Sequence, residues 1–279
     1  MPNGFHMNEN DLKNLTDQAK RIRHSVITSL HAAGSGHLGG SLGLADIFAI
    51  LYGRVMNHRP TQADWPKRDR LILSIGHVAP VLYAALAHHG YFPTSELLTL
   101  RKLNSRLQGH PGRDHGLPGL ELSAGSLGQG LSVAVGVSLA AIYNKNSHKT
   151  FCIMGDGELQ EGSVWEAAMS ASHHKLHNLI AIVDRNGVQI DGRTSQVMEL
   201  EPLADKWKAF GWNVITCNGH DFQELDKAFA SAKNHLLEPT VLIAHTIMGK
   251  GIAEIEGNYR WHGKAPNSEE LERFLSVLT

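Results

Sequence analysis

The sequence predicts an α/β protein with a mostly parallel β-sheet and helices on both faces. From residue 149 onward, short apolar segments alternate with longer segments of helical period, and this alternation is typical of parallel strands joined by right-handed crossovers. The first three of these segments are apolar and short enough to be strands that are buried on both faces. Polar residues follow the segments directly, and in such folds ligands bind at the carboxyl ends of the strands.

The part of the chain before residue 149 is predicted to be largely helical. Residues 11–34 carry apolar side chains at helical spacing, with Asn10 or Asp11 as the expected N-cap and Gly34 at the end. Further helices are expected at 41–56, 79–92, 95–103 and 127–143, with a short strand or extended segment at 69–76. Residues 104–126 are rich in Gly, Pro and His without a clear period, and we interpret them as a functional loop.

The part after residue 149 supplies most of the expected sheet. Its strands are predicted at 150–155, 178–184, 212–219 and 239–246, and its helices at 162–175, 203–211, 221–234 and 267–279. We expect the first three strands to be buried on both faces. Asp156, Asn186, His220 and His245 lie at or just beyond strand ends, where the ligand site is expected.

No clear domain boundary divides residues 11–279, so we expect one domain preceded by an N-terminal extension at 1–10. Met7 is a possible alternative start, which would make residues 1–6 a disordered extension. The polar N-terminus lacks the apolar core of a secretory signal, and no apolar stretch is long enough for a membrane span.

The composition excludes some classes of partner. A hydrophobic fraction of 42% and a charged fraction of 19% are ordinary for a globular protein. The net charge of −1 predicts no general attraction to nucleic acid or to an anionic membrane. Cys152 and Cys217 sit in separate apolar segments, and we expect buried free thiols in a cytoplasmic protein.

The strongest single signal is Gly155-Asp156-Gly157 directly after an apolar segment, with Asn186 after the next one. Glycines let a backbone approach a phosphate closely. Carboxylate and amide oxygens suit Mg²⁺, which shares its ligands with bound phosphates. The alternative is that Asp156 only caps the helix that follows.

Histidine is the second signal. The chain has 18 histidines, and several stand next to glycine in loop-like segments. Imidazole can donate or accept a proton near neutral pH, so such loops suit a site where protons move. Histidines outside these segments are expected to be surface or packing residues.

With these motifs together, the chain resembles the N-terminal, diphosphate-binding half of transketolases over nearly its whole length. Besides the metal motif, the matching blocks are 35–47, 68–77, 109–136 and 258–266. The resemblance implies a thiamine-diphosphate-binding fold of the diphosphate-binding (PP) type over residues 11–279. It implies thiamine diphosphate as cofactor, with Mg²⁺ or alternatively Ca²⁺ or Mn²⁺.

The resemblance also implies roles for single residues. Asp156, Asn186 and the carbonyl of Val188 would bind the metal, and Gly155 and Gly157 the diphosphate. Ile190 would pack on the thiazolium ring, although a plain strand residue there would also be apolar. His77 and His262 would lie near the diphosphate and reacting oxygens, and His37 and His110 near the hydroxyls of the donor sugar.

Other implied contacts are less specific. The segment Gly125, Ser126 and Leu127 would meet the amino group of the cofactor's pyrimidine. Glu161 would lie at a subunit interface that links paired sites, unless it is only a solvated helix residue. Lys250 would neutralise diphosphate. Leu38 and Ser126 replace prolines common in the family, which affects loop rigidity more than chemistry.

The family's full chain is about twice as long, and its second half supplies an activating Glu and the arginines that hold substrate phosphate. We therefore expect the N-terminal subunit of a split transketolase, with a C-terminal partner subunit, self-association into an α2β2 heterotetramer, and sugar phosphates as substrates. The alternatives are another thiamine-diphosphate enzyme, such as 1-deoxyxylulose-5-phosphate synthase or dihydroxyacetone synthase, and a non-catalytic binding protein.

Overall fold

A computed structural model describes residues 7–278 of the chain. The disordered extension expected at 1–6 lies outside this range. Helix α1 (Glu9–Ala33) begins two residues earlier than predicted, and Asn8 is its N-cap, accepting a hydrogen bond from the Asp11 N–H at 2.8 Å. Residues 9 and 10 therefore belong to the first helix and not to an extension.

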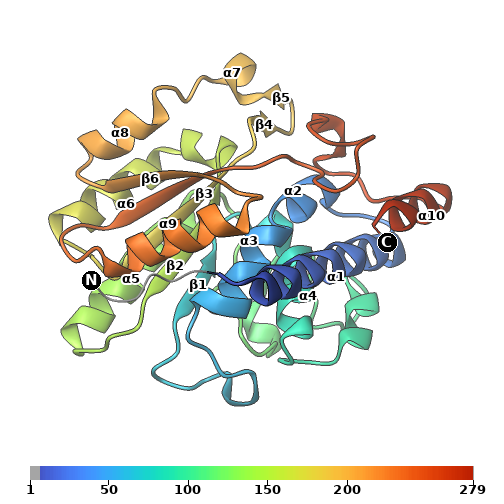
Figure 1. Ribbon diagram of the computed structural model, residues 1–279, viewed down its shortest axis with the longest axis horizontal. Helices are drawn as coiled ribbons and strands as arrows, with labels where there is room; N and C mark the ends of the chain where they lie inside the picture. Colours follow the sequence, from blue (N-terminus) through green and yellow to red (C-terminus); the bar gives the residue numbers. More distant parts are fainter. Residues whose placement is uncertain (1–6, 279) are drawn as a thin grey trace.

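The main sheet has five parallel strands, which confirms the predicted fold class (Figure 1). In spatial order they are β1 (Arg70–Leu73), β2 (Thr150–Gly155), β3 (Leu179–Arg185), β7 (Thr240–His245) and β6 (Asn213–Asn218). A small antiparallel hairpin, β4 (Val188–Gln189) and β5 (Gly192–Arg193), follows β3.

One expectation about the strands was wrong. Strand β6 lies at the sheet edge and is largely half-buried or exposed, whereas β7 lies inside the sheet and is buried except for its last residue. The crossover through helix α9 (Phe222–Asn234) places β7 between β3 and β6.

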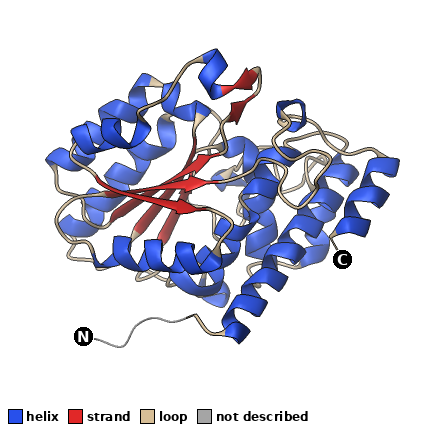
Figure 2. Cartoon of the chain, turned by 45° about the horizontal axis from the view of Figure 1, so that its top comes forward, coloured by secondary structure: helices blue, strands red, loops and turns tan. Residues whose placement is uncertain are grey.

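Helices cover both faces of the sheet (Figure 2). One face packs against α1, α3 (Ala45–Ile50), α4 (Ala79–His88) and α9. The other packs against α5 (Gln129–Tyr143), α6 (Gly162–His173) and α8 (Leu203–Ala209). Strand alternation sends Phe151 and Ile153 to the first core, and Cys152 and Met154 to the second.

The remaining helices are short or peripheral. They are α2 (Leu38–Gly43), α7 (Thr194–Val197) and α10 (Ser268–Val277), the last of which packs against α1. The helix expected at 41–56 is divided into α2, α3 and a π-helical turn at Leu51–Val55. The helix expected at 95–103 is a 3₁₀ segment at Thr94–Thr99.

Both cysteines are buried and free, as expected. No helix within residues 7–278 has the length and apolar character needed to cross a membrane.

Candidate active site

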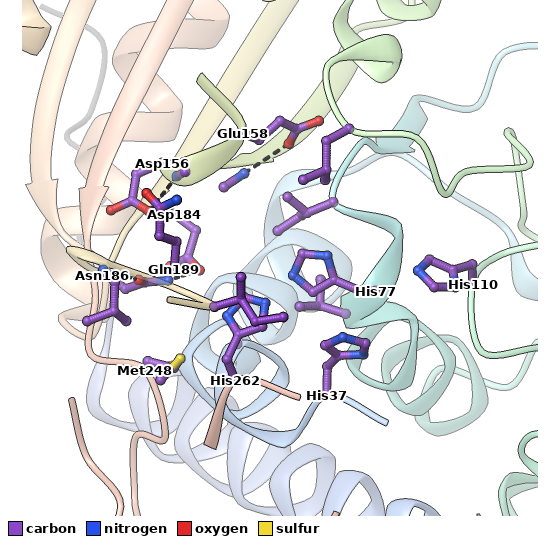
Figure 3. Close-up of a pocket in the computed structure, with 18 of the residues that line it drawn as sticks. His37, His77, His110, Asp156, Glu158, Asp184, Asn186, Gln189, Met248 and His262 are labelled. Atoms are coloured by element: carbon purple, nitrogen blue, oxygen red, sulfur yellow. Dashed lines mark hydrogen bonds between the residues drawn. The ribbon is translucent and has the colours of Figure 1, made fainter. Parts of the chain in front are cut away.

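A cavity of about 330 Å³ opens at the carboxyl ends of β1, β2 and β3 (Figure 3). Its polar side comes from the turns after β2 and β3. Its other walls come from α2, the turn after β1, the irregular loop before α5, the β4–β5 hairpin and the segment after β7. The lining includes His37, His77, His110, Gly125, Leu127, Gly155, Asp156, Gly157, Glu158, Asp184, Asn186, Val188, Ile190, Met248 and His262.

Asp156 lies directly after β2 and is only 1% exposed. Its Oδ2 accepts hydrogen bonds from the Gly187 N–H at 2.7 Å and from Arg185 Nη1 at 2.9 Å. Its Oδ1 accepts one, from the Gly157 N–H at 2.8 Å. Burial raises the pKa of Asp156, and the bonds from Gly187 and Arg185 oppose that rise. Oδ1 is therefore the carboxylate oxygen with capacity left for a cation.

Asn186 is held in one orientation directly after β3. Its Nδ2 donates to Asp184 Oδ2 at 2.8 Å, and its Oδ1 accepts from the Val188 N–H at 3.0 Å. Asp184 is buried and also accepts a hydrogen bond from Thr246 Oγ1. Burial raises the pKa of Asp184 to about 7. The second lone pair of the Asn186 amide oxygen stays available to a ligand.

These donors fit Mg²⁺. Within the described part of the chain, no group of three or more His, Cys, Asp or Glu side chains could hold a metal ion. A cation in this cavity must therefore use a mixed set of oxygens, such as one carboxylate, the Asn186 amide and a backbone carbonyl. A set of oxygen donors with only one negative charge suits Mg²⁺, because bound phosphate oxygens supply further ligands to the ion.

Glu158, whose role the sequence did not suggest, ties this turn to the rest of the cavity. It is 2% exposed and accepts hydrogen bonds from the Gly155 N–H at 3.1 Å, the Gly128 N–H at 2.8 Å and Ser74 Oγ. One carboxylate thus joins the ends of β1 and β2 to the start of α5. The available signal was a carboxylate directly after the Gly-Asp-Gly turn.

The four predicted histidines come together on the other side of the cavity (Figure 3). The ring centroid of His37 lies 4.8 Å from that of His77, 5.6 Å from that of His262 and 6.3 Å from that of His110. The rings of His77 and His262 are 4.9 Å apart. His37 Nδ1 is buried and has no hydrogen-bond partner among residues 7–278, so it can bind a ligand atom.

The surroundings keep these imidazoles neutral. Burial, with the neighbouring histidines, lowers the pKa of His77 to about 3. Burial, His262 and Arg101 lower the pKa of His37 to about 4. Burial is also the main cause that lowers the pKa of His110 and His262. Near neutral pH each uncharged imidazole therefore has one ring nitrogen that donates a hydrogen bond and one that accepts a hydrogen bond.

Apolar side chains line the cavity between the two polar sides. Ile190, at the tip of the β4–β5 hairpin, is 61% exposed although it is a large apolar residue. Leu127 and Met248 also line the cavity. An apolar ring bound between the metal motif and the histidines would cover these side chains.

A family profile described as "Transketolase, thiamine diphosphate binding domain" matches residues 15–277. The chain belongs to the transketolase family. It is 40% identical over 262 residues to an apulose-4-phosphate transketolase subunit of Phocaeicola vulgatus, covering 94% of this chain and 92% of that protein. It is 43% identical over 264 residues to the 6-deoxy-6-sulfo-D-fructose transketolase subunit SqwG of Clostridium sp., covering 95% and 96%.

Longer transketolases match only in part. Human transketolase is 41% identical over 268 residues, which cover 96% of this chain but 42% of the human protein. The crystal structure of Campylobacter jejuni transketolase superposes with a TM-score of 0.90 at 36% identity, covering 95% of this chain and 43% of that one. The chain therefore corresponds to the N-terminal, thiamine-diphosphate-binding part of transketolases.

Some residues expected from the transketolase resemblance do not line the cavity. Lys250 lies against a separate hollow with Arg23 and Asp46, and its Nζ is 3.4 Å from Glu256, so a role in neutralising diphosphate is not supported. Ser126 is exposed and lies outside the cavity lining. Glu161 is also exposed outside the lining, and its expected place at a subunit interface stays a prediction.

Two histidines at strand ends also lie outside the lining. His220 points to Asp46, and His245 is exposed.

Proposed function

We propose that this chain is the cofactor-binding subunit of a two-chain transketolase that transfers a two-carbon ketol unit from a ketose phosphate to an aldose phosphate. The observation that carries the proposal is one cavity with a metal motif on one side and four neutral histidines on the other. The near-complete match to proteins named as transketolase subunits supports the two-chain form.

The residues divide the work of the site. Asp156, Asn186 and the Val188 carbonyl would hold Mg²⁺, and Gly155 and Gly157 would let the diphosphate approach the backbone closely. Thiamine diphosphate supplies an electron sink when bound. Ile190 would pack on the flat face of its thiazolium ring, and Leu127 and Met248 line the same apolar zone of the cavity.

The histidines would orient the sugar and move protons. A ketose offers several hydroxyl groups, and a neutral imidazole can accept a proton from one and return it to another. Figure 3 shows His262 and His77 nearer to the metal motif and His110 farthest from it. We therefore assign His77 and His262 to the reacting end of the sugar, and His37 and His110 to hydroxyls farther along.

The assembly we propose is an α2β2 heterotetramer in the cytoplasm. The activating Glu would come from the C-terminal partner subunit, and we assign that role to no residue of this chain. Two copies of this chain would associate through α5, whose outward side carries the exposed residues Ser132, Gly136, Ala140 and Tyr143.

A mixing experiment tests the proposal. The purified chain is titrated with a C-terminal transketolase subunit in the presence of thiamine diphosphate and Mg²⁺. Ketol transfer from xylulose 5-phosphate to ribose 5-phosphate is then followed. We expect activity only in the mixture, saturating near equal stoichiometry. Full activity of the isolated chain, or a cofactor-loaded complex without ketol transfer, would contradict the proposal.

A matched pair of variants ties the activity to the cavity. Asp156→Ala removes a buried metal ligand, and we expect it to abolish both Mg²⁺-dependent cofactor binding, measured calorimetrically, and activity. Asp205→Ala removes an exposed carboxylate on α8 that pairs with Lys208, and we expect it to leave both unchanged.

A further inference from the structure

Arg101 occupies an unusual position next to the histidine cluster. It follows the 3₁₀ segment Thr94–Thr99 and has φ of 59°, in the left-handed region that non-glycine residues seldom adopt. Its N–H donates to the Leu107 carbonyl at 2.8 Å, which closes the turn that it begins. Strained backbone of this kind persists where surrounding contacts hold it, often at functional sites.

The turn after Arg101 is firmly held. Ser105 Oγ contacts Thr99 Oγ1 at 2.7 Å and accepts from the Leu107 N–H at 3.0 Å. The Gln108 carbonyl accepts a hydrogen bond from Tyr83 on α4 at 3.0 Å. The backbone that carries the Arg101 side chain is therefore fixed to the helical core.

One glycine makes room for the guanidinium group, and a second lies beside it. A Cβ atom on Gly109 would lie 2.7 Å from Nε, Cζ and Nη2 of Arg101 and would clash with them, whereas a Cβ on Gly36 would lie 3.6 Å from Nε, in ordinary contact. These glycines directly precede His110 and His37 in the chain. The guanidinium group therefore packs against the backbone from which both cavity histidines project.

No carboxylate within residues 7–278 forms an ion pair with this guanidinium group. Its Nη1 donates to Ser35 Oγ at 3.4 Å, and the residue is exposed. Arg106, in the same turn, instead has Nη2 at 2.8 Å from Glu96. The positive charge of Arg101 contributes to the lowered pKa of both His37 and His110, so its field reaches the cavity.

The cavity thus has two ends of different chemistry. Asp156 and Asn186 mark one end, and His37 and His110 lie at the other in Figure 3. Arg101 packs beside the glycines that directly precede these two histidines. An anion bound by Arg101 would therefore lie on the histidine side of the cavity, apart from a diphosphate bound at the metal motif.

We propose that Arg101 binds the phosphate-bearing end of the sugar substrate and thereby selects phosphorylated sugars. The inference rests on the proposed ketol transfer and adds a substrate contact within this chain, where the sequence suggested phosphate-binding arginines only in the partner. An arginine fork presents several N–H donors to a tetrahedral oxyanion, and such charge-assisted bonds favour a phosphorylated over an uncharged sugar.

The test uses the complex reconstituted with the C-terminal subunit. Arg101→Gly removes the guanidinium group and relieves the positive φ, so loss of folding is not expected. Arg101→Lys keeps a charge without the fork. Lys102→Ala is the matched control, since it removes the neighbouring positive charge from a separate hollow that contains Glu96 and Asn104. Each complex is measured with xylulose 5-phosphate and ribose 5-phosphate, and with uncharged erythrulose and glycolaldehyde.

We expect Arg101→Gly to raise KM for the phosphorylated pair by about tenfold or more, the loss of a charged hydrogen bond. For the uncharged pair we expect KM to change less than about twofold, and we expect kcat to change by no more than that with either pair. Arg101→Lys should be intermediate and Lys102→Ala near wild type. Equal effects on both pairs, or none, would overturn the inference while leaving ketol transfer intact. An inactive wild-type complex would overturn the proposed function and this inference with it.

Discussion

The surroundings of each histidine in the cavity favour its uncharged form. This lowers the stability of the isolated chain at acidic pH. In the unfolded state an imidazole takes up a proton near pH 6.5, whereas folded His77 does so only near pH 3. Between these values the unfolded state binds more protons. The free energy of unfolding therefore falls as pH falls through 6.5, and this loss stops only near the folded pKa.

We predict that His77→Gln flattens this dependence. Each such histidine contributes a slope of at most about 1.4 kcal/mol per pH unit. Urea unfolding of the isolated chain between about pH 7 and pH 4 measures the slope. His115→Gln, at an exposed site in the irregular loop, is the control and should keep the wild-type slope. A variant at position 77 with an unchanged slope would show that this imidazole is already charged in the folded chain.

At the scale of elements, the segment after β7 is fixed by a polar network that joins α1, α3 and the end of β6. His220 Nδ1 lies 2.7 Å from Asp46 Oδ2, and the Ile247 N–H donates to His220 Nε2 at 2.8 Å. Asp46 is also paired with Arg23, whose Nε donates to the Lys250 carbonyl at 3.0 Å. The network therefore holds both ends of segment 247–250, which carries Met248 into the cavity.

We predict that His220→Ala weakens cofactor binding without removing any cavity residue. Loss of the acceptor for the Ile247 N–H leaves that stretch less ordered, and we expect Kd for thiamine diphosphate to rise by about three- to tenfold. Calorimetry on the complex with the partner subunit measures the change. His235→Ala, which removes a hydrogen bond with Glu238 after α9, is the control. Unchanged affinity would mean that backbone contacts such as that between Gly249 and Gly39 hold the stretch alone.

The local sequence pattern predicted most of the helices and strands. It did not predict features that depend on contacts between residues far apart in the chain. Strand β6 was expected to be buried like β3, but Asn213, Thr216 and Asn218 interrupt its apolar residues, and the crossover through α9 leaves it at the sheet edge. The Gly-Asp-Gly turn and the four histidines were visible because each stands in a recognisable segment. Glu158 and Arg101 were not, because Glu158 is hydrogen-bonded to Ser74 and Arg101 to Ser35, which lie far away in the chain.

At the scale of the whole molecule, α5 is a helix of apolar composition that is covered on one side. It packs against α6 and the sheet, yet Ser132, Gly136, Ala140 and Tyr143 are exposed along its outer side, Tyr143 by 89%. Met169 on α6 adds a second exposed apolar side chain, at 58%. Small residues at helical spacing allow another helix to approach closely, which suits the proposed contact between two copies of this chain.

We predict that Gly136→Arg separates these copies. A Cβ at Gly136 meets no atom within 4 Å, and arginine favours a helix more than glycine does, so the fold should be unharmed. A charged side chain buried between two α5 helices would be costly because it lacks a partner. Light scattering after size exclusion should therefore show about half the wild-type mass for the variant. Ser231→Arg, exposed on α9, should keep the wild-type mass. If Gly136→Arg also kept it, the copies would have to associate through another surface.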